Sequence, residues 1–339
     1  MLIICSLRTD FAAAFHDGCW GTKFIIVFAI WAASLWIPND PVMNGYLQFA
    51  RIVSVIFLFY QALLILVLAY SLNDLLVSNV EKEGGNAFSC SGIVLITIFV
   101  LTTGGNITWL VFEYLRFNKE GCGANLAWLI ITTILGIFMY AIVLFRTRKD
   151  ASMLTSSIVF LYQLFLQWSA MSSYPDPECN PYTNSAGNTT MEIVMGLFFT
   201  FLCLLVIGGS TTSANADGSL TNDMSSHMME KEEDTATYQK VDVNSSADGK
   251  KPIDPEKAHV FPISTATILF QGLMVLASIY YSMLMTNWGN PSMMDDSYSF
   301  FSENYMSYWV QMCALWFSQA LYIFSLTAPI CFPNRDFGE

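Results

Sequence analysis

The segment LYQLFLQWSAMSSYPDPECNP, residues 161–181, begins like a membrane-spanning helix and ends like a rigid loop. Gln163 and Gln167 stand four residues apart in its apolar half, so a helix places both amides on one face. Pro175 and Pro177 then end that helix, because proline removes a backbone donor and clashes with the preceding turn. The segment predicts a lipid-embedded helix with a polar face, followed by a loop outside the membrane.

Apolar runs recur along the whole chain. Of the 339 residues 54% are apolar and only 12% charged, fewer charges than soluble domains usually carry. A helix needs about 20 mainly apolar residues to span the hydrocarbon core of a bilayer. We therefore predict an all-α polytopic membrane protein with about eight transmembrane helices, at residues 20–37, 47–70, 92–114, 124–145, 153–172, 191–209, 263–286 and 307–330.

The second of these runs is too long for a simple span. No Gly or Pro interrupts the chain between Gly45 and Gly84, so a continuous helix there would be about 55 Å long at 1.5 Å per residue. The hydrocarbon core of a bilayer is only about 30 Å thick. Either this helix tilts steeply, or its polar end projects from the membrane.

The polar stretch 210–262 divides the membrane domain. It is rich in Ser, Thr, Asp and Glu and nearly free of aromatic residues, which predicts a disordered acidic loop. It separates residues 1–209, with six spans, from residues 263–339, with two spans and a short tail. Much of the net charge of −12 lies in this loop, so the acidity does not indicate a nucleic-acid partner.

Lysines and arginines favour one orientation in the membrane. If the spans alternate, the 210–262 loop and most basic flanks lie on one side, which the positive-inside rule makes the cytosol. Both ends of this chain are then cytosolic, in the plasma membrane or endomembranes. The basic residues on that side, outside the loop, are Arg8, Lys23, Lys82, Arg146, Arg148, Lys149 and Arg335.

This orientation gives a meaning to three short sequence patterns. Asn188 begins an Asn-Thr-Thr glycosylation sequon on the outer side, although the next span begins close to it. Cys122 and Cys179 are the two cysteines in outer loops, where the compartment is oxidising, and we predict that they pair. In the cytosolic loop Tyr238 to Val241 fits the form read by endocytic adaptors, although such patterns also arise by chance.

The sequence holds no recognisable catalytic constellation. Zinc, nucleophile and phosphate-binding motifs are absent, and we predict no catalytic residue, no cofactor and no metal site. Carboxylates in the spans are limited to their ends, as at Glu113 and Glu192. A coupled pump usually places ionisable groups at mid-membrane, so we expect neither an enzyme nor an ion-driven carrier.

Uncharged polar groups within the spans are the candidate site. Ser156, Gln163 and Gln167 share one face of the fifth span, and Asn106 follows paired glycines in the middle of the third. One interpretation is hydrogen bonding between helices, worth about 0.6 kcal/mol per contact. The other is a hydrophilic groove that admits a lipid headgroup while the tails stay in the bilayer. The sequence leaves both open.

Four blocks resemble the serine incorporator (Serinc, or TMS membrane protein) family. They are AAAFHDGCWGTKF (12–24), LTSSIVFLYQLFLQWSAMSSYPDPECNP (154–181), TNWGNP (286–291) and SYWVQMCALWFSQALYIFSLTAPICFPNRDF (307–337). The resemblance covers essentially the whole chain. It implies ten spans in full-length members, with residues 1–10 matching the end of the second, so this chain is expected to be an N-terminally truncated member.

The resemblance also implies a fold and bears on particular residues. The fold would comprise two helical subdomains separated by a long, tilted crossing helix, for which the second span is the candidate. A cysteine-containing outer loop in the family offers Cys122 and Cys179 other partners. Gln311 departs from the lysine that relatives commonly have after Trp-Val, which would alter headgroup preference if that lysine contacts phosphate.

We therefore expect ATP-independent movement of phospholipids, including phosphatidylserine, between leaflets by a scramblase. The alternative is a non-enzymatic scaffold that supplies serine for phosphatidylserine and sphingolipid synthesis. The expected partners are membrane phospholipids, with endocytic adaptors at the cytosolic loop, and no nucleic acid. A homo-oligomer is compatible with the sequence.

Overall fold

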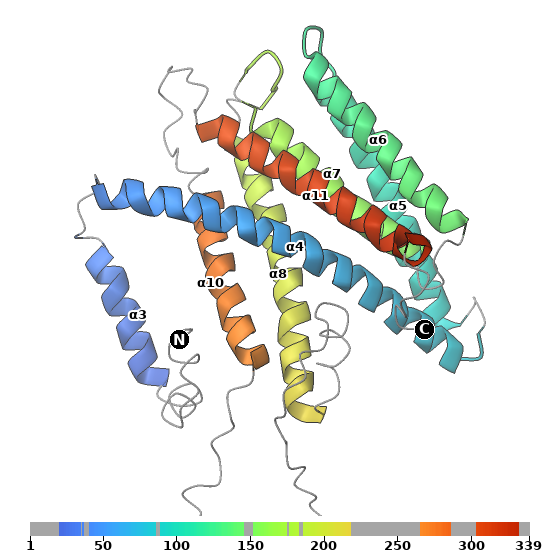
Figure 1. The fold of residues 1–339 in the computed structure, drawn as a ribbon, viewed down its shortest axis with the longest axis horizontal. Coiled ribbons are helices and arrows are strands. Elements are labelled where there is room, and N and C mark those ends of the chain that lie inside the picture. Colours follow the sequence, from blue (N-terminus) through green and yellow to red (C-terminus); the bar gives the residue numbers. More distant parts are fainter. Residues whose placement is uncertain are drawn as a thin grey trace, which may run out of the picture. The chain divides into compact units, whose positions relative to one another are not determined.

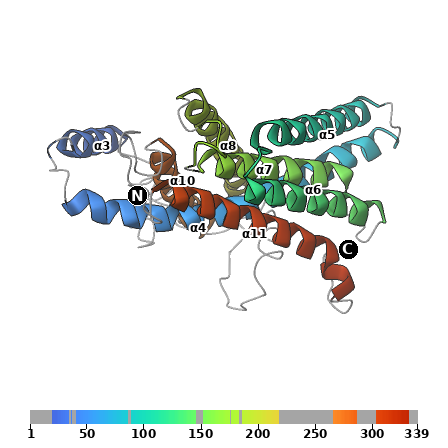
Figure 2. The same cartoon turned by 90° about the horizontal axis from the view of Figure 1, so that it is seen from above.

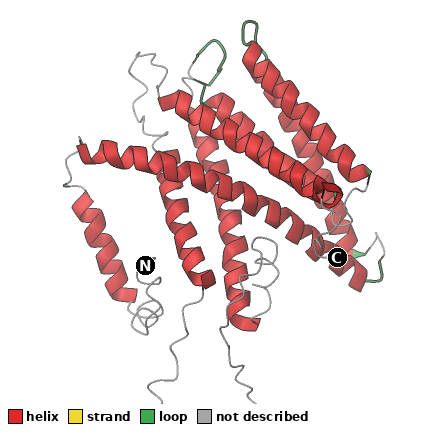
Figure 3. Ribbon diagram, in the orientation of Figure 1, coloured by secondary structure: helices red, strands yellow, loops and turns green. Residues whose placement is uncertain are grey.

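The computed structural model of the chain consists of helices. It describes residues 20–34, 36, 41–85, 89–145, 152–174, 176–182, 186–217, 265–285 and 303–331, and within them it contains no strand. Figure 3 shows every described element as helix or loop. The helices are α3 (Trp20–Ser34), α4 (Pro41–Lys82), α5 (Cys90–Phe117), α6 (Gly123–Leu144), α7 (Met153–Ser172), α8 (Ala186–Asp217), α10 (Thr265–Met285) and α11 (Glu303–Cys331).

Each helix falls on one of the eight predicted runs, which confirms an all-α polytopic membrane protein. Among the described residues, five helices are long and apolar enough to cross a membrane: Gly45–Lys82, Cys90–Phe117, Gly123–Leu144, Met191–Gly209 and Ser307–Ala328. The apolar parts of α3 and α10, Gly21–Ala33 and Ile268–Leu284, are shorter. Helix α7 has the length of a span, but its many polar residues keep it out of this group.

The structure divides the chain into two compact units. One contains residues 1–40 and 207–274, and the other contains residues 41–206 and 275–339. The division falls inside α8, which continues as helix to Asp217, beyond the predicted end of its span at residue 209. Residues 210–217 of the predicted loop therefore continue helix α8, and residues 218–262 lie outside the described residues. The larger unit holds α4, α5, α6, α7, α11, the first part of α8 and the last part of α10, and it contains all four predicted groove residues.

The long helix predicted in the second run is present as α4. It has 42 residues, which gives a length of about 63 Å at 1.5 Å per residue. This is about twice the thickness of the hydrocarbon core. It packs against α5, α7 and α11, and Figure 1 shows it running beside α7 and α11. At its end Gly84 and Gly85 take positive φ angles of 93° and 72°, which glycine tolerates without strain, and the chain turns into α5.

Helix α7 is the centre of the larger unit. Most of its residues are buried, and α4, α5, α6 and α11 all pack against it. Figures 1 and 2 agree in placing α7 and α11 side by side. The side chain of Ser152 accepts a hydrogen bond from the Thr155 N–H at 3.2 Å and so caps the start of the helix. A span enclosed by other helices can carry polar residues, because its side chains meet protein rather than lipid.

An apolar cluster joins four of these helices. Phe160 and Leu164 of α7 pack with residues of α4, α6 and α11, including Ala69, Met139 and Tyr322. By contrast, Leu101 and Leu115 of α5 are 69% and 78% exposed and are available to lipid. Lipid tails are as apolar as these side chains, so close packing and hydrogen bonds hold such helices together.

Gly136 of α6 permits the closest approach in this cluster. A Cβ atom built at Gly136 would lie 2.5 Å from Cε2 of Phe160, far inside van der Waals contact. We expect Gly136→Ala to displace the Phe160 ring and to destabilise the unit by roughly 1–3 kcal/mol, as overpacking does elsewhere. Thermal unfolding of the purified full chain in detergent measures this as a lower midpoint.

The matched control is Gly104→Ala in α5, where a new Cβ meets nothing within 4 Å. That variant should unfold at the wild-type temperature or slightly above it, because alanine favours helix over glycine. Equal midpoints for Gly136→Ala and the wild-type protein would contradict the close packing of Gly136 against Phe160.

Candidate functional site

Polar side chains form a continuous line between α7 and α11, which we call the polar seam. Its members share two properties: they are polar and uncharged, apart from one glutamate, and they face a neighbouring helix. They are Ser156, Gln163, Gln167, Ser169 and Ser173 from α7 and its end, Ser307, Gln311, Ser318 and Tyr322 from α11, and Glu192 from α8.

The seam has an antiparallel register. Ser156 Oγ and Tyr322 OH lie 2.7 Å apart and share a hydrogen bond. The amide of Gln163 donates to Ser318 Oγ at 3.4 Å. At the other end Ser307 donates to Ser173 Oγ at 3.0 Å. As the residue number rises along α7 it falls along α11, so these hydrogen bonds are successive steps along one helix pair.

The seam is nearly as long as the hydrocarbon core of a membrane is thick. The rise from Ser156 to Ser173 along a helix is about 26 Å. The hydrocarbon core is about 30 Å thick. A helix pair that spans the membrane would therefore hold polar groups at nearly every depth, and the only carboxylic acid among them is Glu192, near one end.

Several amide atoms in the seam have no hydrogen-bond partner. Gln167 is fully buried, and neither its Nε2 nor its Oε1 is bonded. The Oε1 atoms of Gln163 and Gln311 are also unpartnered. An unpartnered buried amide costs about 1–3 kcal/mol. The seam therefore combines hydrogen bonds that join the helices with polar atoms that this packing leaves unsatisfied.

The four predicted groove residues fall into two places. Ser156 and Gln163 bond to α11 in the seam, and Gln167 follows Gln163 by four residues on the same face of α7 and is fully buried. Asn106 lies between α5 and its neighbours, where its Nδ2 donates to the Ser157 carbonyl at 2.9 Å and to Tyr140 OH at 3.3 Å. These four side chains are 0–3% exposed, so they are enclosed between helices and do not line an open surface.

Glu192 occupies the end of the seam near the start of α8. Its Oε1 accepts a hydrogen bond from Ser169 Oγ at 2.6 Å and another from Gln311 Nε2 at 3.1 Å. The same Gln311 amide donates to Ser307 Oγ at 3.2 Å. Three helices, α7, α8 and α11, thus meet at one carboxylate. Gln311 touches this acid in the structure.

A second buried carboxylate lies away from the seam. Glu113 of α5 is fully buried and accepts a hydrogen bond from Trp109 Nε1 at 3.0 Å, while its Oε2 has no partner. Trp109 in turn meets the ring of Trp168 edge-on, with 5.8 Å between centroids. Both acids stand near span ends, as the sequence indicates, but only Glu192 joins the α7–α11 contact.

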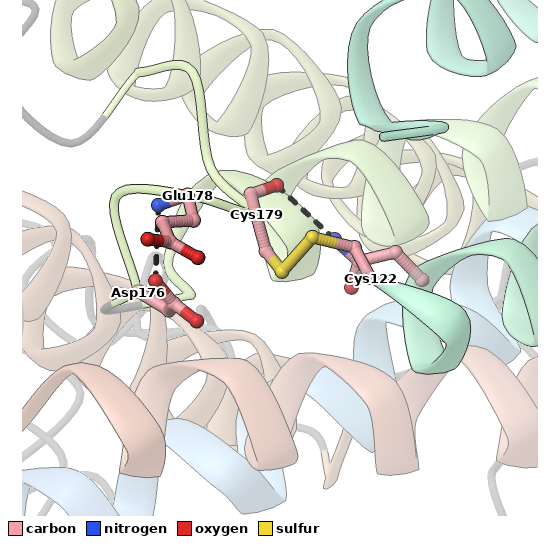
Figure 4. Close-up of a disulfide and its surroundings, with 5 residues drawn as sticks. Cys122, Asp176, Glu178 and Cys179 are labelled. Carbon is pink, nitrogen blue, oxygen red and sulfur yellow. Dashed lines mark hydrogen bonds between the residues drawn. A yellow bond between two sulfur atoms is a disulfide. The ribbon is translucent and has the colours of Figure 1, made fainter. Parts of the chain in front are cut away.

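A disulfide fastens the loop that follows α7. Cys122 precedes α6, Cys179 lies in the loop, and the two are bonded with their Cα atoms 5.5 Å apart (Figure 4). Asn125 Nδ2 donates to the Cys179 carbonyl at 3.2 Å, and Asn180 Nδ2 donates to the Ser172 and Tyr174 carbonyls, both at 2.7 Å. Figure 4 also shows the Glu178 N–H donating to Asp176. The loop that the prolines predicted is therefore tied to α6 and to the end of α7.

The remaining predicted sites bear less on this arrangement. Asn188 lies in the first turn of α8, which begins at Ala186, before the predicted start of the span. Tyr238 and Val241, the sorting-motif candidates, lie outside the described residues.

Apart from Gln311, which the sequence singled out through its departure from the family pattern, the α11 half of the seam and Glu192 were not predicted from the sequence. A signal for α11 was available, because Ser307, Gln311, Ser318 and Tyr322 are spaced by four, seven and four residues, the spacing of one helix face. No comparable pattern marks Glu192, since only its contacts with the other two helices distinguish it from any acid at a span end.

Comparisons with known proteins match nearly the whole chain to one family. The family model described as serine incorporator (Serinc) matches residues 1–335. The chain is 25% identical to a probable serine incorporator of Nematostella vectensis over 97% of its own length and 74% of that protein. It is 26% identical to serine incorporator 2 of Mus musculus, covering 100% of this chain and 75% of the relative. It is 23% identical to serine incorporator 3 of Bos taurus, covering 99% and 76%.

Proposed function

Because the chain belongs to the serine incorporator (Serinc) family, we propose that it moves phospholipids between the two leaflets without ATP and without catalysing a reaction. Its direct partners are then membrane phospholipids, phosphatidylserine among them. The observation that carries this proposal is the polar seam, a line of polar groups about 26 Å long between two helices of a membrane protein.

The seam suits a headgroup better than an ion. A headgroup crossing hydrocarbon loses its hydrogen bonds to water, which makes unassisted transfer slow. Serine hydroxyls and glutamine amides can replace those bonds, and the unpartnered atoms of Gln163, Gln167 and Gln311 gain a partner when they do. Coupled ion transport usually needs ionisable groups near mid-membrane, whereas the described acids of the spans stand near span ends.

Transport requires the two helices to separate. The seam residues are enclosed, so a headgroup reaches them only when α7 and α11 move apart, while the lipid tails stay in the surrounding bilayer. Separation breaks hydrogen bonds between side chains, typically about 0.6 kcal/mol each within membranes. Separation also lets the unpartnered amides form hydrogen bonds. The free energy needed to open this interface is therefore lower than for an apolar interface packed to the same density.

The proposal includes an orientation. The Cys122–Cys179 disulfide supports an orientation in which this end faces the cell exterior or an organelle lumen, because disulfides persist in oxidising compartments. Both ends of the chain, and residues 210–262, then face the cytosol, in the plasma membrane or in endomembranes. Endocytic adaptors would meet the chain at Tyr238 and Val241.

Reconstitution tests the transport function. The full chain is placed in phosphatidylcholine vesicles that contain a trace of acyl-labelled fluorescent lipid, and a membrane-impermeant reductant is then added. We expect the reductant to quench label from both leaflets, whereas empty vesicles lose only the label of the outer leaflet. Equal quenching in the two preparations, with protein shown to be inserted and folded, would rule out this function.

The name of the relatives motivates one alternative. A scaffold that supplies serine to lipid-synthesising enzymes would raise serine-dependent lipid synthesis with expression but leave leaflet exchange unchanged. Labelled-serine incorporation, measured beside the vesicle assay, separates the two functions.

A further inference from the structure

The end of the seam at Glu192 has the chemistry of a binding site. Glu192 is 9% exposed, and both of its hydrogen bonds go to the same oxygen, Oε1. A carboxylate has about four acceptor positions over its two oxygens. Within the described residues, the second oxygen of Glu192 makes no hydrogen bond, so acceptor capacity remains.

The described part of the chain supplies no counter-ion to this carboxylate, since Glu192 has no ion-pair partner there. The sequence segments before α8 and before α11, residues 173–191 and 286–306, contain no Lys, Arg or His, and they add further acids such as Asp176 and Asp295. Burying a carboxylate without a partner costs several kcal/mol. The position therefore favours a cation from outside the chain.

A neighbouring amide supplies a second acceptor. Gln311 is 3% exposed, and its Oε1 has no hydrogen-bond partner. Its Nε2 donates to Glu192, so Oε1, on the same amide group, lies within a few ångströms of the carboxylate. The hydroxyl of Ser307, which accepts from the same Nε2, completes a small group of acceptors.

These acceptors fit one class of cation. A primary ammonium group carries three N–H donors on a compact charge, so it can bond to a carboxylate, an amide oxygen and a hydroxyl together. A trimethylammonium group, as in choline, has no N–H donor and would leave the amide and hydroxyl unpaired. We propose that Glu192 and Gln311 bind a primary ammonium group, from an aminophospholipid headgroup or from a free amino compound.

The first experiment measures which headgroup crosses. Acyl-labelled phosphatidylethanolamine and acyl-labelled phosphatidylcholine are compared in the vesicle assay, with the wild-type full chain and with Glu192→Gln. The variant keeps an acceptor oxygen for Ser169 and Gln311 but loses the charge. We expect the ratio of the phosphatidylethanolamine to the phosphatidylcholine exchange rate to fall about tenfold. An equal change for both lipids, or no change for either, would overturn the site.

The matched control is Glu113→Gln, which removes the other buried carboxylate, bonded to Trp109 rather than to the seam. It should leave the ratio of the two exchange rates at the wild-type value. A fall in that ratio as large as the one in Glu192→Gln would also overturn the site, because any buried acid would then suffice.

The second experiment measures binding without transport. Native mass spectrometry of the detergent-solubilised full chain counts the phosphatidylethanolamine and phosphatidylcholine molecules retained. We expect a preference for phosphatidylethanolamine that Glu192→Gln removes.

Free ethanolamine and L-serine are then added as competitors, with choline and NaCl as controls. Displacement by free amines at millimolar concentration assigns the site to soluble amino compounds as well, and resistance to them assigns it to the lipid. Equal displacement by NaCl or choline would overturn the ammonium assignment.

The lipid form of this inference rests on the proposed transport function, but the two fail in different ways. If no lipid is exchanged while phosphatidylethanolamine is bound selectively through Glu192, the transport function is wrong and the site stands. If lipids are exchanged and bound without preference for a primary ammonium group, the site is wrong and the transport function stands.

A third variant places the cation within the chain. In Gln311→Lys the new ammonium group stands beside Glu192 and occupies its free acceptors. We expect selective retention of phosphatidylethanolamine to disappear although Glu192 is intact. Undiminished selectivity in that variant would contradict the proposed geometry.

Discussion

Replacing Gln163 and Gln167 by leucine is expected to slow lipid exchange by roughly tenfold or more while leaving the protein as stable as before, or more stable. Two amides that could bond a headgroup are lost, at about 0.5–1.5 kcal/mol each, and each 1.36 kcal/mol on a barrier is a factor of about ten in rate. In the folded state, however, Gln167 has no hydrogen bond and Gln163 has one long one, of 3.4 Å. Leucine has nearly the same volume. It removes three unpartnered amide atoms at the cost of the one long hydrogen bond to Ser318, so unfolding should not become easier.

Slower lipid exchange without a loss of stability distinguishes a role of the two glutamines in transport from a role in helix packing. Exchange is measured in vesicles with fluorescent lipid, and stability by the unfolding midpoint in detergent. The matched control is Gln61→Leu, another buried amide of the same unit, which donates to Thr200 at 3.5 Å outside the seam. It should leave exchange unchanged. Unchanged exchange in the double variant, with normal folding, would show that the two glutamines only pack helices.

Removal of the Cys122–Cys179 disulfide is expected to have the largest effect on stability. The bond closes a sequence separation of 57 residues, for which the chain-entropy relation gives about 4 kcal/mol. This is an upper value, because an unfolded membrane protein retains helices and loses less freedom than a random coil. The paired variant Cys122→Ser with Cys179→Ser should therefore unfold several degrees below the wild-type protein in a thermal scan.

Reductant provides the internal control for this experiment. It should lower the unfolding midpoint of the wild-type protein toward that of the paired variant and leave the variant itself unchanged. The other cysteines, including the free thiols Cys90, Cys203 and Cys313 of the described residues, are present in both proteins, so they cancel in the comparison. A reductant effect of the same size in both proteins would show that another bond or modification is responsible.

The positions of the helices could be predicted because each rests on local sequence. Runs of about 20 apolar residues have few alternatives in a membrane, since only a helix satisfies every backbone group internally. The prediction for α7, residues 153–172, has the bounds that the structure gives. The end of a helix was predicted less exactly where the sequence has no local stop signal. Helix α8 continues past residue 209 to Asp217, and no proline interrupts it there.

The partners of the polar groups could not be predicted in this way. The shared face of Ser156, Gln163 and Gln167 follows from helical spacing, and the structure joins Ser156 and Gln163 to α11 and buries Gln167 completely. Which residue each meets depends on how two helices far apart in the chain are aligned. Gln163 and Ser318 are separated by 155 residues, and a shift of one turn would exchange the partner.

The sequence by itself therefore determined that this is a helical membrane protein, where its helices lie, and that α7 carries uncharged polar groups on one face. These properties depend on spacing within single helices and on the absence of water in the bilayer core. Only the tertiary structure decided that those groups form an enclosed seam with α11 and that Glu192 closes its end. Contacts among α7, α8 and α11 exist only after the helices have packed, and the packing of distant segments leaves no local pattern in the sequence.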